Sequence, residues 1–233
     1  MQRWVNILET NCDPTREAEY NEWYEGIHIP DVLKTPGFTH ARRYQTKEFR
    51  DGRGKYMAFY GIETDDIEKT MQDRLERRAQ EYKLGRGSVN RPNFEFALWR
   101  DVLWTQIFAS TSPHSSTSKV GKWVNLVEHN CDPAREDEYH DWYNNIHIPD
   151  VLKTPGFVSA MRYRINEFRD GRGKFLAIYE IETDDIENTM QVRLADRAEA
   201  VKQGRAGDNR PHLIRPVWRD VLWRQLSEHT ATP

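Results

Sequence analysis

The pattern of hydrophobic and polar positions repeats along this chain with an offset of 119 residues, so that Trp4 corresponds to Trp123. The stretch IHIPDVLKTPGF, for example, occurs at 27–38 and again at 146–157. A period of this length is the size of a small domain and too long for a solenoid. We therefore predict a tandem duplication, with repeats at 1–107 and 122–228. The Ser/Thr-rich segment 108–121, which lacks an apolar period, is predicted to be the linker.

Each repeat shows the same series of elements; the ranges that follow are those of the first repeat. Alternating or continuous apolar stretches predict strands at 4–9, 38–45, 55–63 and 94–107. The second and third strands are joined by a stretch with Asp51-Gly52, a pair that is typical of a hairpin turn.

Two segments have helical periodicity. The first begins with Asp13 as N-cap and Pro14 at the first helical position. Its apolar residues are spaced three and four apart: Tyr20, Trp23, Tyr24 and Ile27. The second, at 64–83, is predicted to be capped by Asp65 together with Glu68. Its apolar stripe is Ile67, Met71, Leu75, Ala79 and Tyr82.

The resulting order, β-α-β-β-α-β, predicts an α+β, ferredoxin-like unit with both helices on one face of a four-stranded sheet. The other face of each sheet needs a cover. Two copies in one chain would supply it for each other, so we expect the two repeats to pack sheet to sheet as a pseudo-dimeric α+β barrel.

Composition and charge narrow the class of protein. The net charge of −3, with 30% charged residues, offers no basic field for nucleic acid. No apolar stretch approaches the ~20 residues of a membrane span, and the N-terminus lacks a secretory signal pattern. We therefore expect a soluble, cytoplasmic protein. Its two cysteines, Cys12 and Cys131, are expected to be free thiols.

Aromatic residues are abundant, with eight Trp, ten Tyr and nine Phe, enough to line a pocket for a flat ligand. Sequence motifs for nucleotide phosphates, dinucleotides, zinc or a serine nucleophile are absent. We therefore predict no cofactor and no metal site.

At the end of the first helix stands W-Y-x-x-x-H-x-P-x-V, followed by P-G-F-x-x-A-x-R-Y, in both copies. With the element order, this resembles the dimeric α+β barrel superfamily, and within it EthD-like proteins and their tandem-fused relatives. The resemblance covers nearly the whole chain. It implies a small, often aromatic ligand between the sheet and the helices. The superfamily includes isomerases, cyclases, cofactor-free monooxygenases and haem enzymes, so the fold leaves the reaction open.

His28 and His147 are the first candidates for chemistry. Histidine exchanges protons near neutral pH, and a helix C-terminus favours its charged form. We expect general acid/base catalysis from both. The structural alternative is a histidine that caps the helix or pairs with Asp31 or Asp150.

The candidates for binding a ligand also occur in both copies. Aromatic residues of the helix would stack on a ring or pack in the core: Trp23, Tyr24, Trp142 and Tyr143. Arginine and tyrosine stand side by side on a strand, so that only one of each pair can face a given cavity: Arg43, Tyr44, Arg162 and Tyr163.

Asn6 and Asn125 alternate with apolar strand residues. With Val5 and Ile7 toward the helices, Asn6 would face the other repeat, where its amide would orient a ligand or satisfy the core.

The two halves differ at several positions. His129 replaces Thr10, and Glu180 replaces Gly61. These residues lie on strands expected to be neighbours, so they predict a catalytic Glu–His pair in the second half only. The alternative is neutral drift at exposed positions.

Together these features favour a cofactor-independent lyase or isomerase that moves protons on a small aromatic or enolisable compound. Isomerisation, cyclisation, deformylation and decarboxylation are all of this kind. One alternative is a haem enzyme of the same fold, with His28, His147 or His212 as the axial ligand. The other is a non-catalytic protein that binds a small ligand. Free sheet edges would also allow the chain to form a homo-oligomer.

Overall fold

The computed structural model describes residues 1–46, 54–87, 94–113, 121–166, 173–206 and 213–232, with the backbone alone for 94–100 and 213–219. The predicted turn at Asp51-Gly52 and the haem-ligand candidate His212 lie outside the described residues.

The first repeat contains β1 (Gln2–Cys12), the 3-10 turn η1 (Pro14–Arg16), α1 (Glu17–Trp23), the π-helical turn η2 (Tyr24–His28), α2 (Ile29–Leu33), β2 (Phe38–Thr46), β3 (Tyr56–Thr64), α3 (Ile67–Lys83) and β4 (Phe94–Thr111). The second contains β5 (Lys122–Cys131), η4 (Pro133–Arg135), α4 (Glu136–Trp142), η5 (Tyr143–His147), α5 (Ile148–Val151), β6 (Phe157–Ile165), β7 (Phe175–Glu182), α6 (Ile186–Lys202) and β8 (Leu213–Thr230). The predicted α+β class and the repeated β-α-β-β-α-β order are confirmed.

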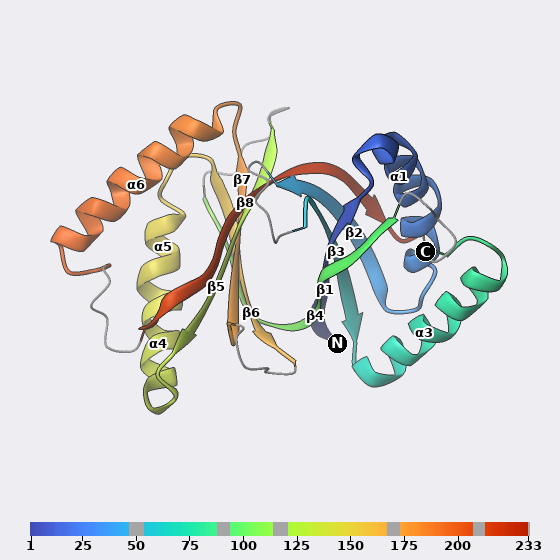
Figure 1. The fold of residues 1–233 in the computed structure, drawn as a ribbon. Coiled ribbons are helices and arrows are strands. Elements are labelled where there is room, and N and C mark those ends of the chain that lie inside the picture. The colour runs from blue at the N-terminus through green and yellow to red at the C-terminus, as the bar shows by residue number, and fades with distance from the viewer. Residues whose placement is uncertain (47–53, 88–93, 114–120, 167–172, 207–212, 233) are drawn as a thin grey trace. The chain divides into compact units, whose positions relative to one another are not determined.

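Neighbouring strands are hydrogen-bonded in the closed order β1-β3-β2-β8-β5-β7-β6-β4. The chain divides into two compact units: unit 1 is Met1–Thr105 with Gln225–Pro233, and unit 2 is Gln106–Arg224. Within each unit the helices lie on one face of the sheet (Figure 1).

The two long strands cross the boundary between the units. β4 continues to Thr111, so the predicted linker is wrong over 108–111, and 114–120 lie outside the described residues. The end of β4 belongs to unit 2, where Ser112 donates its backbone N–H to Val158 at 2.8 Å. The end of β8 belongs to unit 1, where Ala231 donates in the same way to Thr39 at 2.8 Å. Each unit is thus completed by a strand end from the other repeat.

The helix starts follow from local capping. Asp13 accepts a hydrogen bond from the Thr15 backbone N–H, as predicted for an N-cap. In α3 the cap is Asp66, which accepts from the Lys69 N–H at 2.9 Å, so the prediction of Asp65 is wrong by one residue. The two aspartates are adjacent, and sequence alone does not distinguish which side chain reaches the helix.

The two faces of β1 are the reverse of the prediction. Trp4, Leu8 and Cys12 pack in the core under the helices, so Asn6 also faces the helices, whereas Val5 and Ile7 are buried on the other face of β1. The two faces of a strand with apolar residues on both sides look alike in sequence, because the period of two does not say which face is which.

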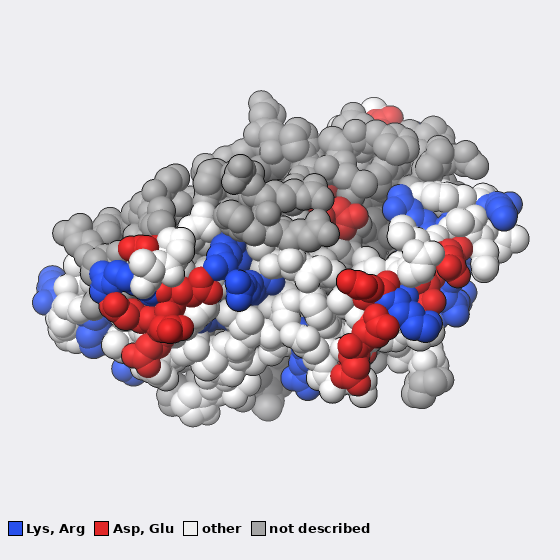
Figure 2. All heavy atoms as spheres, turned by 90° about the horizontal axis from the view of Figure 1, so that it is seen from below, with Lys and Arg blue, Asp and Glu red and all other residues white. Residues whose placement is uncertain are grey.

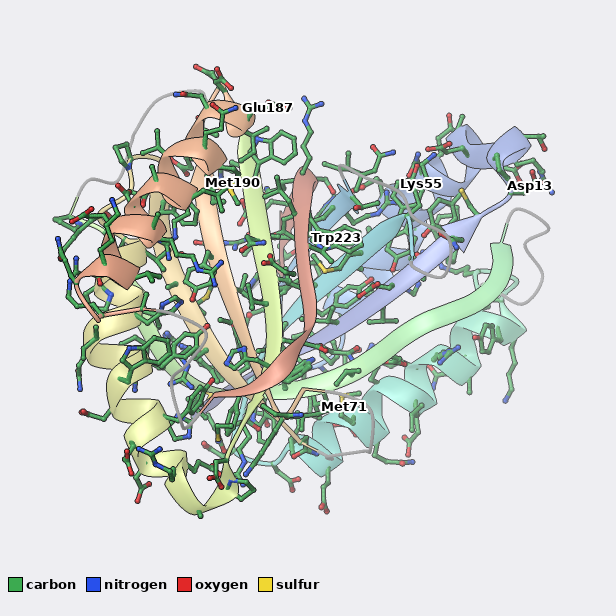
Figure 3. All side chains as sticks on the ribbon, turned by 60° about the vertical axis from the view of Figure 1, so that its left-hand side comes forward. Asp13, Lys55, Met71, Glu187, Met190 and Trp223 are labelled. Atoms are coloured by element: carbon green, nitrogen blue, oxygen red, sulfur yellow. The ribbon has the colours of Figure 1, made fainter. Side chains whose placement is uncertain are left out.

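The predicted apolar stripe of α3 is partly wrong. Ile67 and Met71 pack against the core, but Leu75 is 55% exposed and the buried positions are Thr70 and Arg74. Met71 and its equivalent Met190 on α6 are labelled in Figure 3. A charged residue therefore takes the place in the sheet-facing row that an apolar residue was expected to hold.

The surface carries charges of both signs, and the cysteines are buried. On the face in Figure 2, Lys and Arg side chains lie beside Asp and Glu rather than forming a field of one sign. Cys12 and Cys131 are buried and form no disulfide, as predicted. Within the described ranges, none of the helices is both long and apolar enough to cross a bilayer.

Candidate functional site

A cavity lies between the sheet and the helices in each unit, at equivalent positions in the two repeats. Its volume is about 140 Å³ in unit 1 and about 360 Å³ in unit 2. An enclosed apolar cavity of about 150 Å³ holds one benzene ring. The first cavity therefore has room for one ring, and the second for a compound of about two or three rings.

Each cavity has an aromatic wall and a cationic wall. Predicted residues in the aromatic wall are Trp23, Tyr24 and His28 in unit 1, and Trp142, Tyr143 and His147 in unit 2. The cationic wall comes from the long helices and consists of Arg74 and Arg78 in unit 1, and Arg193 and Arg197 in unit 2.

The histidine stands at the end of the π-helical turn. The Ile29 backbone N–H donates to the carbonyl of Tyr24, five residues earlier. Pro30 follows and has no N–H of its own, which favours a widened turn. Such single π turns are frequent at functional sites. The helix continues through α2, so His28 does not end it.

Aromatic rings hold the histidine in place. The His28 ring stacks on Trp23 at 5.0 Å between centroids and meets the edge of Tyr24 at 4.8 Å. His147 repeats this arrangement with Trp142 at 4.9 Å and Tyr143 at 4.8 Å. The histidines are half-buried, and both line the cavities.

Both histidines are neutral at physiological pH. Burial, followed by the charges of Arg74 and Arg78, lowers the pKa of His28 to about 3. Burial with Arg193 and Arg197 does the same for His147, whose pKa is also about 3. The expected charged form is therefore wrong, because desolvation and nearby arginines oppose it and the helix does not end there.

The buried asparagines hold carboxylates in the cavity wall. Asn6 donates its side-chain N–H to Asp101 at 2.9 Å, and Asn125 donates to Asp220 at 2.8 Å. Asn6 and Asp101 line the first cavity, and their counterparts line the second. The asparagines therefore line the cavities, but from the helix-facing side of the sheet and not from the face toward the other repeat; their part in binding a ligand stays a prediction.

The tryptophans have a structural role as well. The Trp23 indole N–H donates to the backbone carbonyl of Arg86 at 3.0 Å, and Trp142 donates to Arg205 at 3.0 Å. These bonds tie the segment after the long helix to the first helix. Because the N–H is already used, the indole offers a ligand its ring surface only.

The strand arginines lie behind the aromatic wall. The Arg43 guanidinium is 4.4 Å from the centroid of Tyr24 and donates to Glu25 at 2.8 Å. Arg162 is 4.2 Å from the centroid of Tyr143 and donates to Asn144 at 2.7 Å. Neither arginine lines a cavity, so direct contact with a ligand is not what this geometry supports.

Tyr44 and Tyr163 are buried on the opposite face of the sheet from the cavities, where they cannot touch a ligand of these sites. The two residues of each Arg-Tyr pair point to opposite faces of the sheet, and neither lines one of these two cavities.

The predicted pair of His129 and Glu180 is wrong. In the register of β5 and β7, His129 lies opposite Phe175 and Glu180 lies opposite Val124. Glu180 is thus on the other face of the sheet, where it accepts a hydrogen bond from Ser159. His129 lines the second cavity and is hydrogen-bonded to Tyr139. Burial, followed by Arg162, lowers its pKa to about 3.

The long-helix arginines and a second tyrosine in each aromatic wall were missed. Tyr60 and Tyr179 come from β3 and β7, and Tyr143 and Tyr179 are hydrogen-bonded at 3.0 Å between their oxygens. The signal for Arg74 was its place one turn after Met71, on the sheet-facing row of α3. An arginine at such a position is normally assigned to the solvent face.

The fit of a metal or a haem can be tested against these residues. No group of three or more His, Cys, Asp or Glu side chains placed to hold a metal ion occurs in the described part of the chain. A porphyrin has four pyrrole rings, and the larger cavity has room for about two or three benzene-sized rings. A haem therefore does not fit either cavity as it stands.

Comparison with solved structures identifies the fold. An anthrone oxidase-like protein superposes with a TM-score of 0.61 at 17% identity, over 100% of this chain and 94% of that one. A provisionally assigned monooxygenase from Fusobacterium nucleatum subsp. nucleatum has a TM-score of 0.61 at 13% identity, over 98% and 94%. Chlorite dismutase from Candidatus Nitrospira defluvii has a TM-score of 0.59 at 11% identity, over 97% and 91%. At these identities the similarity concerns the fold alone.

A search of curated protein sequences returns no match. Comparison with protein families does return one, in both repeats. The matched residues are 5–84 and 124–209, which hold β1 to α3 of unit 1 and β5 to α6 of unit 2 and therefore the aromatic and cationic walls of both cavities. The chain thus belongs to the family described as a domain of unknown function, DUF4286, and carries that domain twice.

Proposed function

We propose that this protein is a cofactor-independent enzyme that moves a proton on a small aromatic or enolisable compound bound between the sheet and the helices. The observation that carries the proposal is a neutral histidine on a π-helical turn. This histidine lines a cavity together with an aromatic wall and an arginine. Isomerisation, cyclisation and carbon–carbon cleavage such as deformylation or decarboxylation all use these parts.

The histidine would accept the proton. Removing a proton from an enolisable carbon or a phenol leaves an anion on the substrate, and Arg193 in the wall of the second cavity would stabilise that charge. The same anion favours the charged form of His147, because it offsets the arginines that depress its pKa. Ligand binding therefore brings the histidine closer to the range in which it transfers protons well.

The size of the second cavity suggests the kind of compound. A volume of about 360 Å³ accommodates two or three fused rings, whereas about 140 Å³ accommodates one. Anthrone is a three-ring ketone that enolises readily, and one structural relative is described as anthrone oxidase-like. Polycyclic ketones and phenols are therefore the compounds to test first.

The test is proton exchange on a bound ligand. One- to three-ring aromatic ketones are incubated with the protein in D₂O, and deuterium at the carbon beside the carbonyl is followed by mass spectrometry. We expect faster exchange with the wild type than in buffer without protein. The acceleration should be lost in the double variant His28→Gln, His147→Gln. Acceleration that survives in the double variant, or none with any ketone, would overturn the assignment.

Binding without chemistry is the second candidate function. The observation that favours it is the pKa of about 3 of both cavity histidines, which makes them weak bases in the free protein. Recovery of a tightly bound aromatic compound unchanged after long incubation, without deuterium incorporation, would select this function.

A further inference from the structure

The two cavities share one frame but differ at the end of the long helix. In unit 1 this end carries Glu81 and Tyr82, and Gly87 follows it. In unit 2 the equivalent residues, offset by 119 positions, are Ala200, Val201 and Ala206. The tryptophan bonds to the Arg86 and Arg205 carbonyls are the same length in both units, 3.0 Å. The backbone at the mouth is therefore held alike, and the side chains make the difference.

In unit 1 these side chains line the cavity and are bonded to its arginines. Arg74 donates to both carboxylate oxygens of Glu81, at 2.6 and 3.0 Å, and the two side chains are only 10% and 12% exposed. Arg78 donates to the Tyr82 hydroxyl at 2.7 Å. The Tyr82 ring lies so close to Gly87 that a Cβ there would be 1.7 Å from it. Cation, carboxylate and ring thus satisfy one another and leave about 140 Å³.

In unit 2 the carboxylate and the ring are missing. Arg193 occupies the position of Arg74, and Ala200 replaces its carboxylate partner. Within the described ranges, Arg193 forms no hydrogen bond or ion pair with another side chain. Burial lowers the pKa of its guanidinium, which shows that the charge is poorly solvated. The cavity beside it is more than twice as large, at about 360 Å³.

We propose that the cavity of unit 2 is the ligand site of this chain, that it selects aromatic anions, and that Arg193 binds their carboxylate or phenolate group. The cavity of unit 1 is smaller, and its arginine is already paired with Glu81. The inference rests on the proposed function in that the ligand is a small aromatic compound, and it adds the charge of that compound and the half of the chain that binds it.

Electrostatics gives the ligand an orientation as well. A half-buried guanidinium that has no side-chain partner among the described residues is stabilised by an anion, most strongly by a two-oxygen group that accepts two parallel N–H bonds. Asp220 lies in another part of the wall, on β8, and would repel a negative group there. The anionic end of the ligand therefore points to α6, and its rings lie along His147 and Tyr143.

The experiment compares a matched pair of two-ring probes, 2-naphthoate and the neutral 2-naphthamide, by isothermal titration calorimetry on the full chain. We expect one naphthoate per wild-type chain and about tenfold or more weaker binding of the amide. Arg193→Gln should weaken naphthoate binding by a similar factor and leave the amide nearly unchanged.

Two substitutions of Ala200 test the role of charge without changing Arg193 itself. Ala200→Glu gives Arg193 the internal carboxylate that Arg74 has, and should weaken naphthoate binding by about tenfold or more. Ala200→Gln has nearly the same volume without the charge, and should keep most of the affinity for naphthoate. Equal effects of the two substitutions would mean that volume, and not charge, decides binding.

The reverse change should enlarge the first cavity and free its arginine. The triple variant Glu81→Ala, Tyr82→Val, Gly87→Ala reproduces the mouth of unit 2 in unit 1, so we expect the stoichiometry to rise from one naphthoate per chain to two. Circular dichroism checks that each variant is folded. Two sites in the wild type, or a triple variant that is folded but binds only one naphthoate, would overturn the assignment of the single ligand site to unit 2.

The outcomes separate this inference from the proposed function. If the amide binds as tightly as naphthoate, the charge selectivity is wrong while aromatic binding stands. If naphthoate binds selectively but no ketone exchanges its protons, the inference stands and the catalytic proposal is wrong. If neither probe binds, the inference is wrong, and the catalytic proposal is decided by the ketone exchange alone.

Discussion

Buried histidines make the stability of this protein depend on pH. His129 is 1% exposed, and its pKa is about 3 in the folded chain against 6.5 as the ordinary value. Between these values the unfolded chain binds more protons than the folded one. The contribution of His129 to the free energy of unfolding is therefore fully present above pH 6.5. It is lost as the pH falls toward 3, by up to about 1.4 kcal/mol per pH unit.

The substitution His129→Thr tests this, because threonine is the residue at the equivalent position of unit 1, where Thr10 and Tyr20 are hydrogen-bonded at 2.6 Å. We expect the difference in unfolding free energy between pH 7.5 and 4.5 to shrink by about 1–3 kcal/mol relative to the wild type. Urea unfolding at both pH values measures it. Thr10→Ser adds no titrating group and serves as the control; an unchanged pH dependence in His129→Thr would contradict the burial of a neutral imidazole.

Several residues of the site could be predicted from sequence. The helical spacing of Trp23, Tyr24 and His28 placed them on one face, and they do line one cavity. Arg193 could not be predicted, because its significance comes from the absence of a carboxylate at Ala200, which matters only once the helix end is seen beside the cavity. The predicted pair of His129 and Glu180 was wrong because residues on neighbouring strands share a face of the sheet only if the register places them so. The register of β5 and β7 places these two on opposite faces.

At the scale of the element, the orientation of α3 is open to a paired test. Leu75 is 55% exposed, whereas Met71 packs against the core of unit 1. We expect Leu75→Glu to change the unfolding free energy by no more than about 0.5 kcal/mol, and Met71→Glu to lower it by about 1–3 kcal/mol. Chemical denaturation of both variants measures this. A larger loss in Leu75→Glu would mean that the helix is rotated from the described orientation.

The end of β8 is held in unit 1 by a half-buried carboxylate. Glu25 accepts hydrogen bonds from Arg43 and Ser227, each at 2.8 Å, and is paired with His229. Burial alone would raise the pKa of Glu25, but these partners outweigh it and the pKa is lowered. In unit 2 the equivalent residue is Asn144.

The substitution Glu25→Asn should therefore loosen the end of β8. We expect faster amide hydrogen exchange in the last strand residues, at 225–230, and a loss of about 1–3 kcal/mol of unfolding free energy, since charged hydrogen bonds are removed. Mass spectrometry of peptic fragments locates the change. Glu22→Asn, an exposed position on α1, is the control, and equal exchange in both variants would contradict the anchoring role.

At the scale of the whole molecule, neither repeat contains all the strands of its own unit. Unit 1 takes Gln225–Pro233 from the end of the chain, and unit 2 begins with the end of β4 at Gln106. The two strand ends are equivalent in the repeat, and their backbone bonds to Thr39 and Val158 match at 2.8 Å. The first repeat therefore contains a strand end equivalent to the one that completes unit 1, but its own strand end is part of unit 2.

A half chain of residues 1–121 should consequently form a homodimer, in which each copy supplies its strand end to the other. Light scattering after size-exclusion chromatography measures the mass. We expect dissociation to accompany unfolding, so that the midpoint of denaturation rises with protein concentration. A folded monomer with a midpoint independent of concentration would contradict this prediction.

The sequence alone determined the duplication, the order of the elements and most of the aromatic wall, because these depend on local periods, capping residues and direct comparison of the two repeats. Only the tertiary structure decided which face of β1 meets the helices, where the two strand ends belong, and why the two cavities differ. The first two features depend on contacts between residues far apart in the chain, and the third depends on which side chains at the end of the long helix meet beside the cavity. Arg74 and Glu81 form a closed pair in one unit, and Arg193 without such a partner becomes visible only by comparison with it.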